Sequence, residues 1–507
     1  MSGGGFEDAA QAGIDGAVAD YVVVGSGAGG GAAARVLAAS GRSVIVLEEG
    51  PLVTRADVGA TAFESMSRLF RQAGMSAALG RSAIPVLQAR CVGGGTFVNS
   101  AIVWRLPEKV LGRWRGELGL AEGLPEAALE DAYATIEAEL AVRPVADEIA
   151  SRSDVLMRAG AERAGIAHRA VVRSERGCRG SGRCFHGCPN DAKQSGPVNA
   201  LRRAVADGAR VLAQARVRRI QVERGRAVAV LGRIEGPGPH AGRSLRVEAR
   251  RAVVVAASVV QSPNLLRRSG IATGSAALGN HFMAHPGTSV VGLYRDPVNP
   301  WTGASQGYEA YGLRDLLGVK FESINVPPEV AASRLPGVGA RFAARVERLP
   351  HLAIWAAALR ADAEGTVRPS RLLGGDLVRY TPTPGDLDRL RQGLKRLAEM
   401  HFLAGATEVL PGVHGLPESI SSPDGLDVFD RAPLDPCAYS LVATHLFGTC
   451  RAGPDPRRAV VDPHLRVHGV EGLYVMDASV FPTNTGVNPQ HSIMAVATVA
   501  ARRLAAG

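Results

Sequence analysis

The sequence has few lysines, few aromatic residues and no long apolar run. Only four of its 58 basic residues are lysine, and aromatic residues make up 5% of the 507-residue chain. No apolar run approaches the roughly 18 residues of a membrane-spanning helix. No basic cluster is interleaved with aromatic residues, as it would be in a nucleic-acid-binding segment. We therefore expect no membrane span, and no nucleic acid as a partner despite the net charge of +10.

Cysteine is also scarce, and the first twenty residues carry Asp and Glu but neither Lys nor Arg. That polarity is opposite to the polarity of a secretion signal. Six cysteines, three of them within eleven residues, do not form the framework of a small disulfide-rich protein. The content of 46% hydrophobic and 21% charged residues is typical of a globular protein. We expect a cytoplasmic protein of two or three domains.

A strand, a glycine-rich turn, a helix and a second strand are predicted near the start of the chain. Residues 21–24 and 44–47 are apolar, residues 25–30 read Gly-Ser-Gly-Ala-Gly-Gly, and small residues fill 32–39. This order is typical of the first unit of a dinucleotide-binding fold. The alternative interpretation is a glycine-rich turn that binds no ligand, and the pattern alone does not distinguish FAD from NAD.

Each residue of this turn has a predicted role. Gly25 permits the tight turn, Gly27 lets the backbone approach a pyrophosphate, and Gly30 lets the helix pack close to the strand. The helix predicted at 32–39 offers free N–H groups and a partial positive charge to phosphates at its N-terminus, and Ala28 in the turn is expected to bind the cofactor. Glu48, about twenty residues further on, is placed to bind ribose hydroxyls.

Several segments in the rest of the chain carry a family resemblance. Residues 444–450 read Thr-His-Leu-Phe-Gly-Thr-Cys, 473–479 read Leu-Tyr-Val-Met-Asp-Ala-Ser, and 486–489 read Gly-Val-Asn-Pro. They resemble the C-terminal signature of the glucose–methanol–choline (GMC) flavin oxidoreductases, and 253–269 resembles a second signature of that family. The loop 93–99 is similar to the flavin loop of the cholesterol oxidase branch. The cysteine-rich loop at 178–188, which is followed by Lys193-Gln194-Ser195, is similar to loops of family members related to long-chain alcohol oxidases.

The resemblance implies an α/β fold, in which a Rossmann-like FAD-binding domain is interleaved with an antiparallel-sheet substrate domain. The expected FAD-binding domain is discontinuous and comprises 18–110, 200–290 and 440–507. The expected substrate domain, with a cysteine-rich loop, comprises 111–199 and 291–439.

The implied activity is the oxidation of an alcohol (CH–OH) to a carbonyl by hydride transfer to flavin N5. His445 matches the family's catalytic histidine, and we expect it to act as base or as hydrogen-bond partner of the alkoxide. Asn488 is expected to orient the hydroxyl, and oxygen or another acceptor would take the electrons. His285 has no such support and is expected to be structural or solvent-facing. The alternatives are a redox-inert flavin-containing lyase of the same fold and a non-enzymatic flavin-binding protein.

The resemblance also implies further FAD contacts, and the FAD is expected to be bound non-covalently. A helix is predicted after Pro489, and its positive end would face the flavin. Four residues of the middle segment are candidates to line the substrate pocket: Tyr308, Tyr311, Glu322 and Trp355. The further residues expected to bind the cofactor are Gly94, Gly95, Thr96, Asn99, Val217, Ala257, Asp477, Ala478, Pro489 and Gln490.

A cysteine-rich loop is the one feature outside the usual family pattern. Cys178, Cys184 and Cys188 follow the spacing C-x5-C-x3-C, with glycines between them and a proline after the last. Three thiolates suit a [3Fe-4S] cluster, and three thiolates with His186 suit zinc. A packed loop of buried thiols without metal is the third interpretation.

Overall fold

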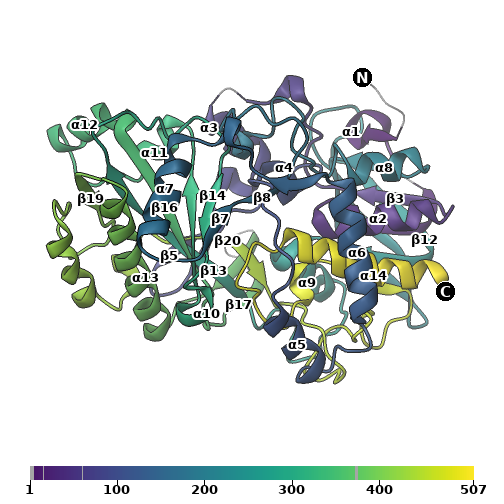
Figure 1. Cartoon of the computed structure of the whole chain (residues 1–507). Helices are drawn as coiled ribbons and strands as arrows, with labels where there is room; N and C mark the ends of the chain where they lie inside the picture. Colours follow the sequence, from purple (N-terminus) through teal and green to yellow (C-terminus); the bar gives the residue numbers. More distant parts are fainter. Residues whose placement is uncertain (1–4, 15, 60, 371–374) are drawn as a thin grey trace.

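The computed structural model describes the whole chain except residues 1–4, 15, 60 and 371–374. Two large sheets organise the described part, and they lie in the two halves of the molecule in Figure 1. The first sheet has the order β1-β9-β3-β2-β12-β11-β10, and β21 pairs with β12 beside β11. Its strands are β1 (Phe6–Asp8), β2 (Ala17–Val24), β3 (Val44–Leu47), β9 (Arg210–Ala213), β10 (Ala215–Glu223), β11 (Arg226–Ile234), β12 (Ser244–Val255) and β21 (Leu473–Val475).

The first sheet is parallel from β1 to β12 and also between β12 and β21, whereas β11 and β10 pair antiparallel. Strand β12 pairs in parallel with β2 on one side, and β11 and β21 share its other side. The strands β2 and β3 are apolar and buried along their paired stretch, as expected for a parallel sheet covered on both faces. The expected order of strand, turn, helix and strand at residues 21–47 is confirmed.

Helices cover the first sheet, and small residues in them allow a close approach to the neighbouring strands and turns. Helix α14 packs on α2 and α6, and α8 packs on α2 (Figure 1). Gly30 of α2 lies so close to the preceding turn that a Cβ there would be 2.0 Å from the Gly25 carbonyl oxygen. Gly25 itself has a φ of +98°, which favours glycine. The helices of this half are α2 (Ala28–Ala39), α6 (Glu126–Glu139), α8 (Ala200–Ala206), α9 (Ser258–Arg268) and α14 (Gln490–Ala506).

The second sheet is antiparallel throughout and has the order β19-β13-β16-β15-β14-β7, with β20 paired with β13. Helix α7 (Arg152–Arg163) and helix α13 (Pro384–Leu403) pack against it. Four leucines of α13 are buried: Leu387, Leu390, Leu394 and Leu397. The strands are β7 (His168–Ala170), β13 (Met283–Leu293), β14 (Tyr308–Ala310), β15 (Val319–Ile324), β16 (Leu352–Leu359), β19 (Glu408–Leu410) and β20 (Val442–Phe447).

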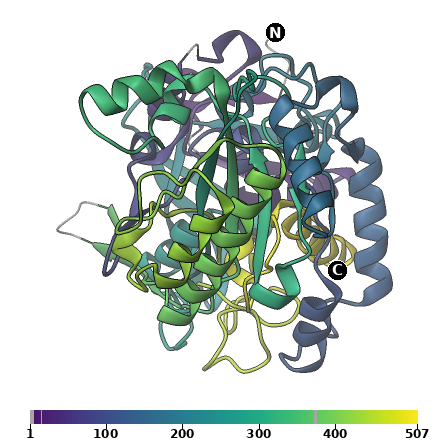
Figure 2. The same ribbon diagram turned by 60° about the vertical axis from the view of Figure 1, so that its left-hand side comes forward.

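Smaller elements complete the described part, and Figure 2 shows the second half of the molecule from the front. A four-stranded sheet joins β17 (Thr366–Ser370), β18 (Gly375–Arg379), β4 (Ala77–Leu79) and β5 (Ala83–Pro85), and β6 (Val142–Pro144) pairs with β8 (Val172–Ser174). The remaining α-helices are α1 (Ala9–Ala12), α3 (Ala62–Leu69), α4 (Gly95–Val98), α5 (Glu108–Gly116), α10 (Arg314–Leu317), α11 (Pro328–Ala332) and α12 (Ala340–Glu347).

The expected fold class, a parallel sheet interleaved with an antiparallel one, is confirmed. The domain limits stay a prediction, and contacts cross them: β20 lies in the second sheet, and α6 packs on α14. Among the described residues, no helix has both the length and the apolarity needed to span a membrane.

The close approach of Gly30 to the Gly25 carbonyl predicts how substitutions change stability. We expect Gly30→Ala to lower the free energy of unfolding by about 2 kcal/mol, because the new methyl group meets a backbone carbonyl that cannot move aside. The matched control is Gly112→Ala in α5, where a Cβ meets nothing within 4 Å and where alanine should stabilise by about 0.5 kcal/mol. Chemical denaturation of both variants measures the two effects, and equal stabilities would contradict the packing argument.

Candidate functional site

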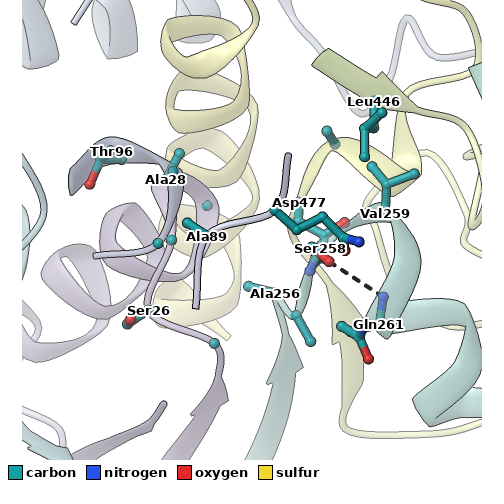
Figure 3. Close-up of a pocket in the computed structure, with 18 of the residues that line it drawn as sticks. Ser26, Ala28, Ala89, Thr96, Ala256, Ser258, Val259, Gln261, Leu446 and Asp477 are labelled. Atoms are coloured by element: carbon teal, nitrogen blue, oxygen red, sulfur yellow. Dashed lines mark hydrogen bonds between the residues drawn. The ribbon is translucent and has the colours of Figure 1, made fainter. Parts of the chain in front are cut away.

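One large cavity of about 450 Å³ lies where the two sheets meet. The carboxyl ends of β2, β3 and β12 open into it, as does the segment after β21, and β20 contributes Thr444, His445 and Leu446. Figure 3 shows residues of the glycine turn, of α9 and of the 477 turn around the same space. A crevice at the carboxyl ends of parallel strands is the usual ligand site of such sheets.

All but one of the residues expected from the sequence to bind the cofactor, and both candidate catalytic residues, line this single cavity. Gly30 is the exception, because it lies under the turn, where it permits the close packing described above. The residues that line the cavity are Gly25, Gly27, Ala28, Glu48, Gly94, Gly95, Thr96, Asn99, Val217, Ala257, His445, Asp477, Ala478, Asn488, Pro489 and Gln490.

The glycine turn and the loop after Val92 face each other across a narrow part of the cavity. A Cβ on Gly94 would lie 3.0 Å from Cα of Gly27, whereas a Cβ on Gly27 would meet nothing within 4 Å. No side chain caps the N-terminus of α2, so its first N–H groups stay available to a ligand. A phosphorylated, flat ligand fits this arrangement of open backbone and uncapped helix end.

Glu48 lines the cavity, but both of its carboxylate oxygens already accept hydrogen bonds from the protein. Oε2 accepts from the backbone N–H of Ser26 at 3.2 Å and from its hydroxyl at 2.6 Å, and Oε1 accepts from the Gly50 N–H at 2.9 Å. Ser26 Oγ in turn accepts from the N–H of Gly93 at 2.9 Å. Glu48 therefore ties the glycine turn to the facing loop, and its contact with a ribose stays a prediction.

Asp477 has a comparable position at the other side of the cavity (Figure 3). Its Oδ2 accepts from the Ser258 N–H at 3.0 Å and from the Ser262 hydroxyl at 2.5 Å, and its Oδ1 accepts from the Ser479 N–H at 2.8 Å. Burial raises the pKa of Asp477 despite these bonds. The carboxyl group holds the start of α9 beside the turn after β21, and its contact with the cofactor stays a prediction.

The loop that contains Gly94 to Asn99 is fixed by polar contacts to distant segments. Asn99 Nδ2 donates to Gln490 Oε1 at 2.5 Å, which joins the loop to the start of α14. The buried ammonium group of Lys193 donates to the carbonyls of Phe97 and Asn99. Pro489, Gln490 and the N-terminus of α14 therefore lie at the cavity wall, as the sequence led us to expect.

His445 is half-buried on β20, and its ring meets that of His285 on β13. The two Nδ1 atoms are 3.2 Å apart, and the rings are perpendicular. Burial lowers the pKa of His445 to about 4 and lowers the pKa of His285 well below its usual value. Both rings are therefore neutral near pH 7, and the expectation that His285 is structural or solvent-facing missed its contact with the candidate catalytic residue.

The hydrogen bonds assign the protons of this pair. The backbone N–H of Gly486 can only donate, so His285 Nε2, 3.0 Å away, must accept. Neutral His285 then carries its proton on Nδ1 and donates it to His445 Nδ1. Neutral His445 consequently carries its own proton on Nε2, which makes this nitrogen a hydrogen-bond donor.

Asn488, the second candidate catalytic residue, is held from the antiparallel sheet. Its Oδ1 accepts from the ammonium group of Lys320 at 2.6 Å, and that ammonium group also donates to Glu309 at 2.9 Å and Glu322 at 2.5 Å. All four side chains are buried. No feature of the sequence singled out Lys320 or Glu309, because only the pairing of β14 with β15 brings them together.

The four residues expected to line a substrate pocket lie outside the lining of this cavity. Tyr308 bonds His168 at 2.8 Å, Tyr311 packs edge-on against Trp104, and Trp355 stacks on His401 with ring centroids 3.6 Å apart. Glu322 comes nearest, since its Oε2 accepts at 2.7 Å from Gln306, which does line the cavity. That expectation was wrong because strand residues were assigned without knowing which face of the sheet they occupy.

The cysteine-rich loop does not fit a metal. Among the described residues, no group of three or more His, Cys, Asp or Glu side chains is arranged to hold a metal ion. The guanidinium of Arg173 lies 3.1 Å from Cys184 Sγ and 4.0 Å from Cys178 Sγ, so a cation occupies the space between these thiols. His186 instead bonds the Ser65 hydroxyl at 3.0 Å. The prediction of a [3Fe-4S] cluster at Cys178, Cys184 and Cys188, and the zinc alternative, therefore find no support.

Sequence analysis missed several polar residues of the cavity wall. Gln261 and Arg268 of α9, Arg216 of β10 and Gln306 all reach the cavity. Gln261 and Arg268 belong to the segment 253–269 whose signature was noted, so that signature was the available signal. Gln306 carries no pattern of its own, because it lies in a loop.

The cysteine-rich loop makes an analytical prediction. We expect the purified protein to contain no stoichiometric iron or zinc and to show no electron paramagnetic resonance signal of a cluster. The reason is that the Arg173 guanidinium lies between the thiols, where a metal ion would have to bind. Elemental analysis and the visible spectrum of wild type and Cys184→Ser measure this. Iron near three atoms per chain, lost in the variant, would contradict the structure.

Comparison with known proteins agrees with the site. The GMC oxidoreductase model matches residues 66–287, and its C-terminal counterpart matches residues 364–497. An uncharacterized GMC-type oxidoreductase of Mycobacterium tuberculosis is 40% identical over 487 residues, which cover 95% of this chain and 75% of that protein. A long-chain-alcohol oxidase of Arabidopsis thaliana is 27% identical, over 96% of this chain and 66% of its own length.

Solved structures share the fold. The crystal structure of pyridoxine 4-oxidase from Mesorbium loti superposes with a TM-score of 0.68 at 21% identity, covering 96% of this chain and 98% of that one. The family models confirm the family expected from the sequence. The two family models together match more than half of the chain, and the chain belongs to the GMC oxidoreductases.

Proposed function

We propose that the chain binds FAD without a covalent bond in the cavity and oxidises an alcohol to a carbonyl. GMC oxidoreductases bind FAD, and the observation that carries the proposal is the composition of one cavity wall. The dinucleotide-type turn at Gly25–Gly30 and the polar pair His445 and Asn488 border the same space, although they are more than 400 residues apart in sequence.

The residues that would hold FAD are the open backbone at Gly27, the N-terminus of α2 and the loop at Gly94–Asn99. Among the described lining residues there is no cysteine, and His445 is the only histidine, which supports non-covalent binding. When bound, FAD supplies the acceptor for the hydride and electron pair that leave the alcohol carbon.

His445 and Asn488 supply the polar groups that the alcohol oxygen needs. The Nε2–H of His445 and the amide N–H of Asn488 would both donate to this oxygen and stabilise the charge that develops on it. For His445 to take the hydroxyl proton at Nε2, its own proton must first move to Nδ1. His445 Nδ1 would then donate a hydrogen bond to His285 Nδ1, so His285 would have to carry its own proton on Nε2. A protonated Nε2 cannot accept from the Gly486 N–H, and this contact would be lost. The Gly486 contact therefore favours the donor tautomer before reaction, and the hydroxyl proton would pass to His445 Nε2 in the other tautomer of the pair while the hydride leaves to FAD.

The apolar side chains in the cavity wall indicate the class of substrate. Apolar side chains such as Leu87, Ile102 and Leu446 line it beside the polar pair. An alcohol with an apolar body fits this wall, in agreement with the similarity to long-chain-alcohol oxidases. The acceptor of the electrons, oxygen or another molecule, is left to the experiment.

The redox proposal is tested by anaerobic reduction. We expect aliphatic alcohols to bleach the flavin absorbance near 450 nm under anaerobic conditions, a band typical of oxidised flavins. A flavin that stays oxidised with every alcohol, while a cyanohydrin is cleaved, would favour the redox-inert lyase. A flavin-binding protein without any reaction is the remaining alternative.

His445→Ala should slow this bleaching by about 100- to 10,000-fold, because the alcohol oxygen loses the side chain that handles its charge and proton. The flavin content of the variant should stay near that of wild type, since the backbone rather than His445 forms the nucleotide cradle. His414→Ala is the control, because His414 lies outside the cavity lining. Equal rates in wild type and His445→Ala would exclude a catalytic role for this histidine.

The depressed pKa of His445 predicts a pH profile. Because its folded pKa is about 4, the imidazole stays neutral as the pH falls from 8 to 5 and becomes charged only below that range. We expect the rate of flavin reduction to be flat between pH 5 and 8 and to fall near pH 4. Stopped-flow measurement across this range is decisive, and an acid limb near pH 6.5 would contradict the neutral buried imidazole.

A further inference from the structure

The buried side chain of Lys320 has no role in the activity proposed so far. Lys320 is one of four lysines in the chain, and its side chain is only 3% exposed. A buried ammonium group is costly unless its charge is paired and its donors are satisfied. Here three N–H donors meet three acceptors, on Glu309, Glu322 and Asn488.

The antiparallel sheet builds this arrangement. Lys320 and Glu322 are two residues apart on β15 and therefore point to the same face. Glu309 of β14 is paired in register with Glu322. The second oxygen of each carboxylate is also satisfied, by Arg169 at 2.7 Å for Glu309 and by Gln306 at 2.7 Å for Glu322.

The charges in this cluster balance. The positive charges of Lys320 and Arg169 offset the negative charges of Glu309 and Glu322. The neighbouring carboxylates raise the pKa of Lys320 despite its burial, and the ammonium group lowers the pKa of Glu322. Lys320 therefore keeps its charge at neutral pH and stays a hydrogen-bond donor at all three positions.

This donor fixes the orientation of the Asn488 amide. An ammonium group only donates, so the Asn488 atom that faces it must be the carbonyl oxygen. The amide nitrogen is then the second polar atom of the side chain and has two N–H groups, of which one bonds Glu322 and one is left for the cavity that Asn488 lines. Without Lys320 the amide would lose the donor that selects its oxygen, and only the bond to Glu322 would still favour one of its two orientations.

We propose that Lys320 is a positioning residue that holds the Asn488 amide with its nitrogen toward the substrate oxygen. This inference rests on the proposed alcohol oxidation, in which that oxygen gains negative charge and needs donors rather than a carbonyl dipole. Glu309 and Glu322 keep Lys320 in place and balance its charge.

A double-mutant cycle tests the coupling. The variants are Lys320→Met, Asn488→Ala and the double variant, and the readout is the rate of anaerobic flavin reduction together with KM and flavin content. We expect each single variant to slow reduction about 10- to 100-fold. The double variant should be within about threefold of Asn488→Ala, because Lys320 acts through the amide. Effects that multiply would overturn the proposal.

Two further variants separate positioning from folding. Lys395→Met is the matched control, since Lys395 is a lysine that pairs with Asp427 and Asp430 at the surface, and its rate should equal that of wild type. If Lys320→Met does not fold, Lys320→Met with Glu322→Gln keeps the charge balance and takes its place in the cycle. A cycle with this pair whose effects multiply overturns the proposal equally.

A crystal structure of the flavin-loaded Lys320→Met variant provides a readout that needs no turnover. We expect the Asn488 side chain to turn over or to occupy two orientations, as judged from its hydrogen-bond partners. An amide that stays in a single orientation with its oxygen toward residue 320 would overturn the proposal. Failure of every alcohol to reduce the wild-type flavin would instead count against the proposed function, so the two outcomes are distinguishable.

Discussion

The close contact between the glycine turn and the ends of neighbouring strands determines the rest of the site. A Cβ on Gly25 would lie 2.3 Å from the Ala256 carbonyl oxygen, and one on Gly29 would lie 1.8 Å from the Met476 carbonyl oxygen. The turn after β2 therefore touches the segments after β12 and β21 directly. Any larger side chain would push these three strand ends apart, and the cavity that they border depends on their closeness.

The two sheets contribute different chemistry to this cavity. The parallel sheet provides open backbone and the N-terminus of a helix, which bind phosphate groups without needing particular side chains. The antiparallel sheet provides side chains with fixed protons and charges: His445 with His285, and Lys320, which holds Asn488 of the loop before α14. A buried polar group is useful in catalysis only if its partners leave one orientation, and each of these two pairs does so with donors that cannot reverse.

The sequence predicted what is local and missed what depends on pairing. Gly25, Gly27, His445 and Asn488 stand in short patterns whose chemistry can be recognised from neighbours in sequence, and the structure brings them to one cavity. Lys320 stands in no such pattern, because its relation to Asn488 arises from strand register and from a separation of 168 residues. The cysteine pattern misled for the converse reason: thiol spacing was visible in the sequence, but the guanidinium that lies among the thiols was not.

The cysteine-rich loop gains a structural interpretation from its buried cations. Arg173 is 1% exposed and bonds the Ser100 carbonyl, while Lys193 is 2% exposed and bonds the carbonyls of Phe97 and Asn99. Both cations therefore hold the backbone of residues 97–100, at the end of the loop that lines the cavity, by hydrogen bonds to its carbonyl groups. The polarisable sulfur of Cys184 lies beside the Arg173 guanidinium. A rigid loop at the ligand wall needs its carbonyls satisfied on the side away from the ligand, and these two side chains satisfy them.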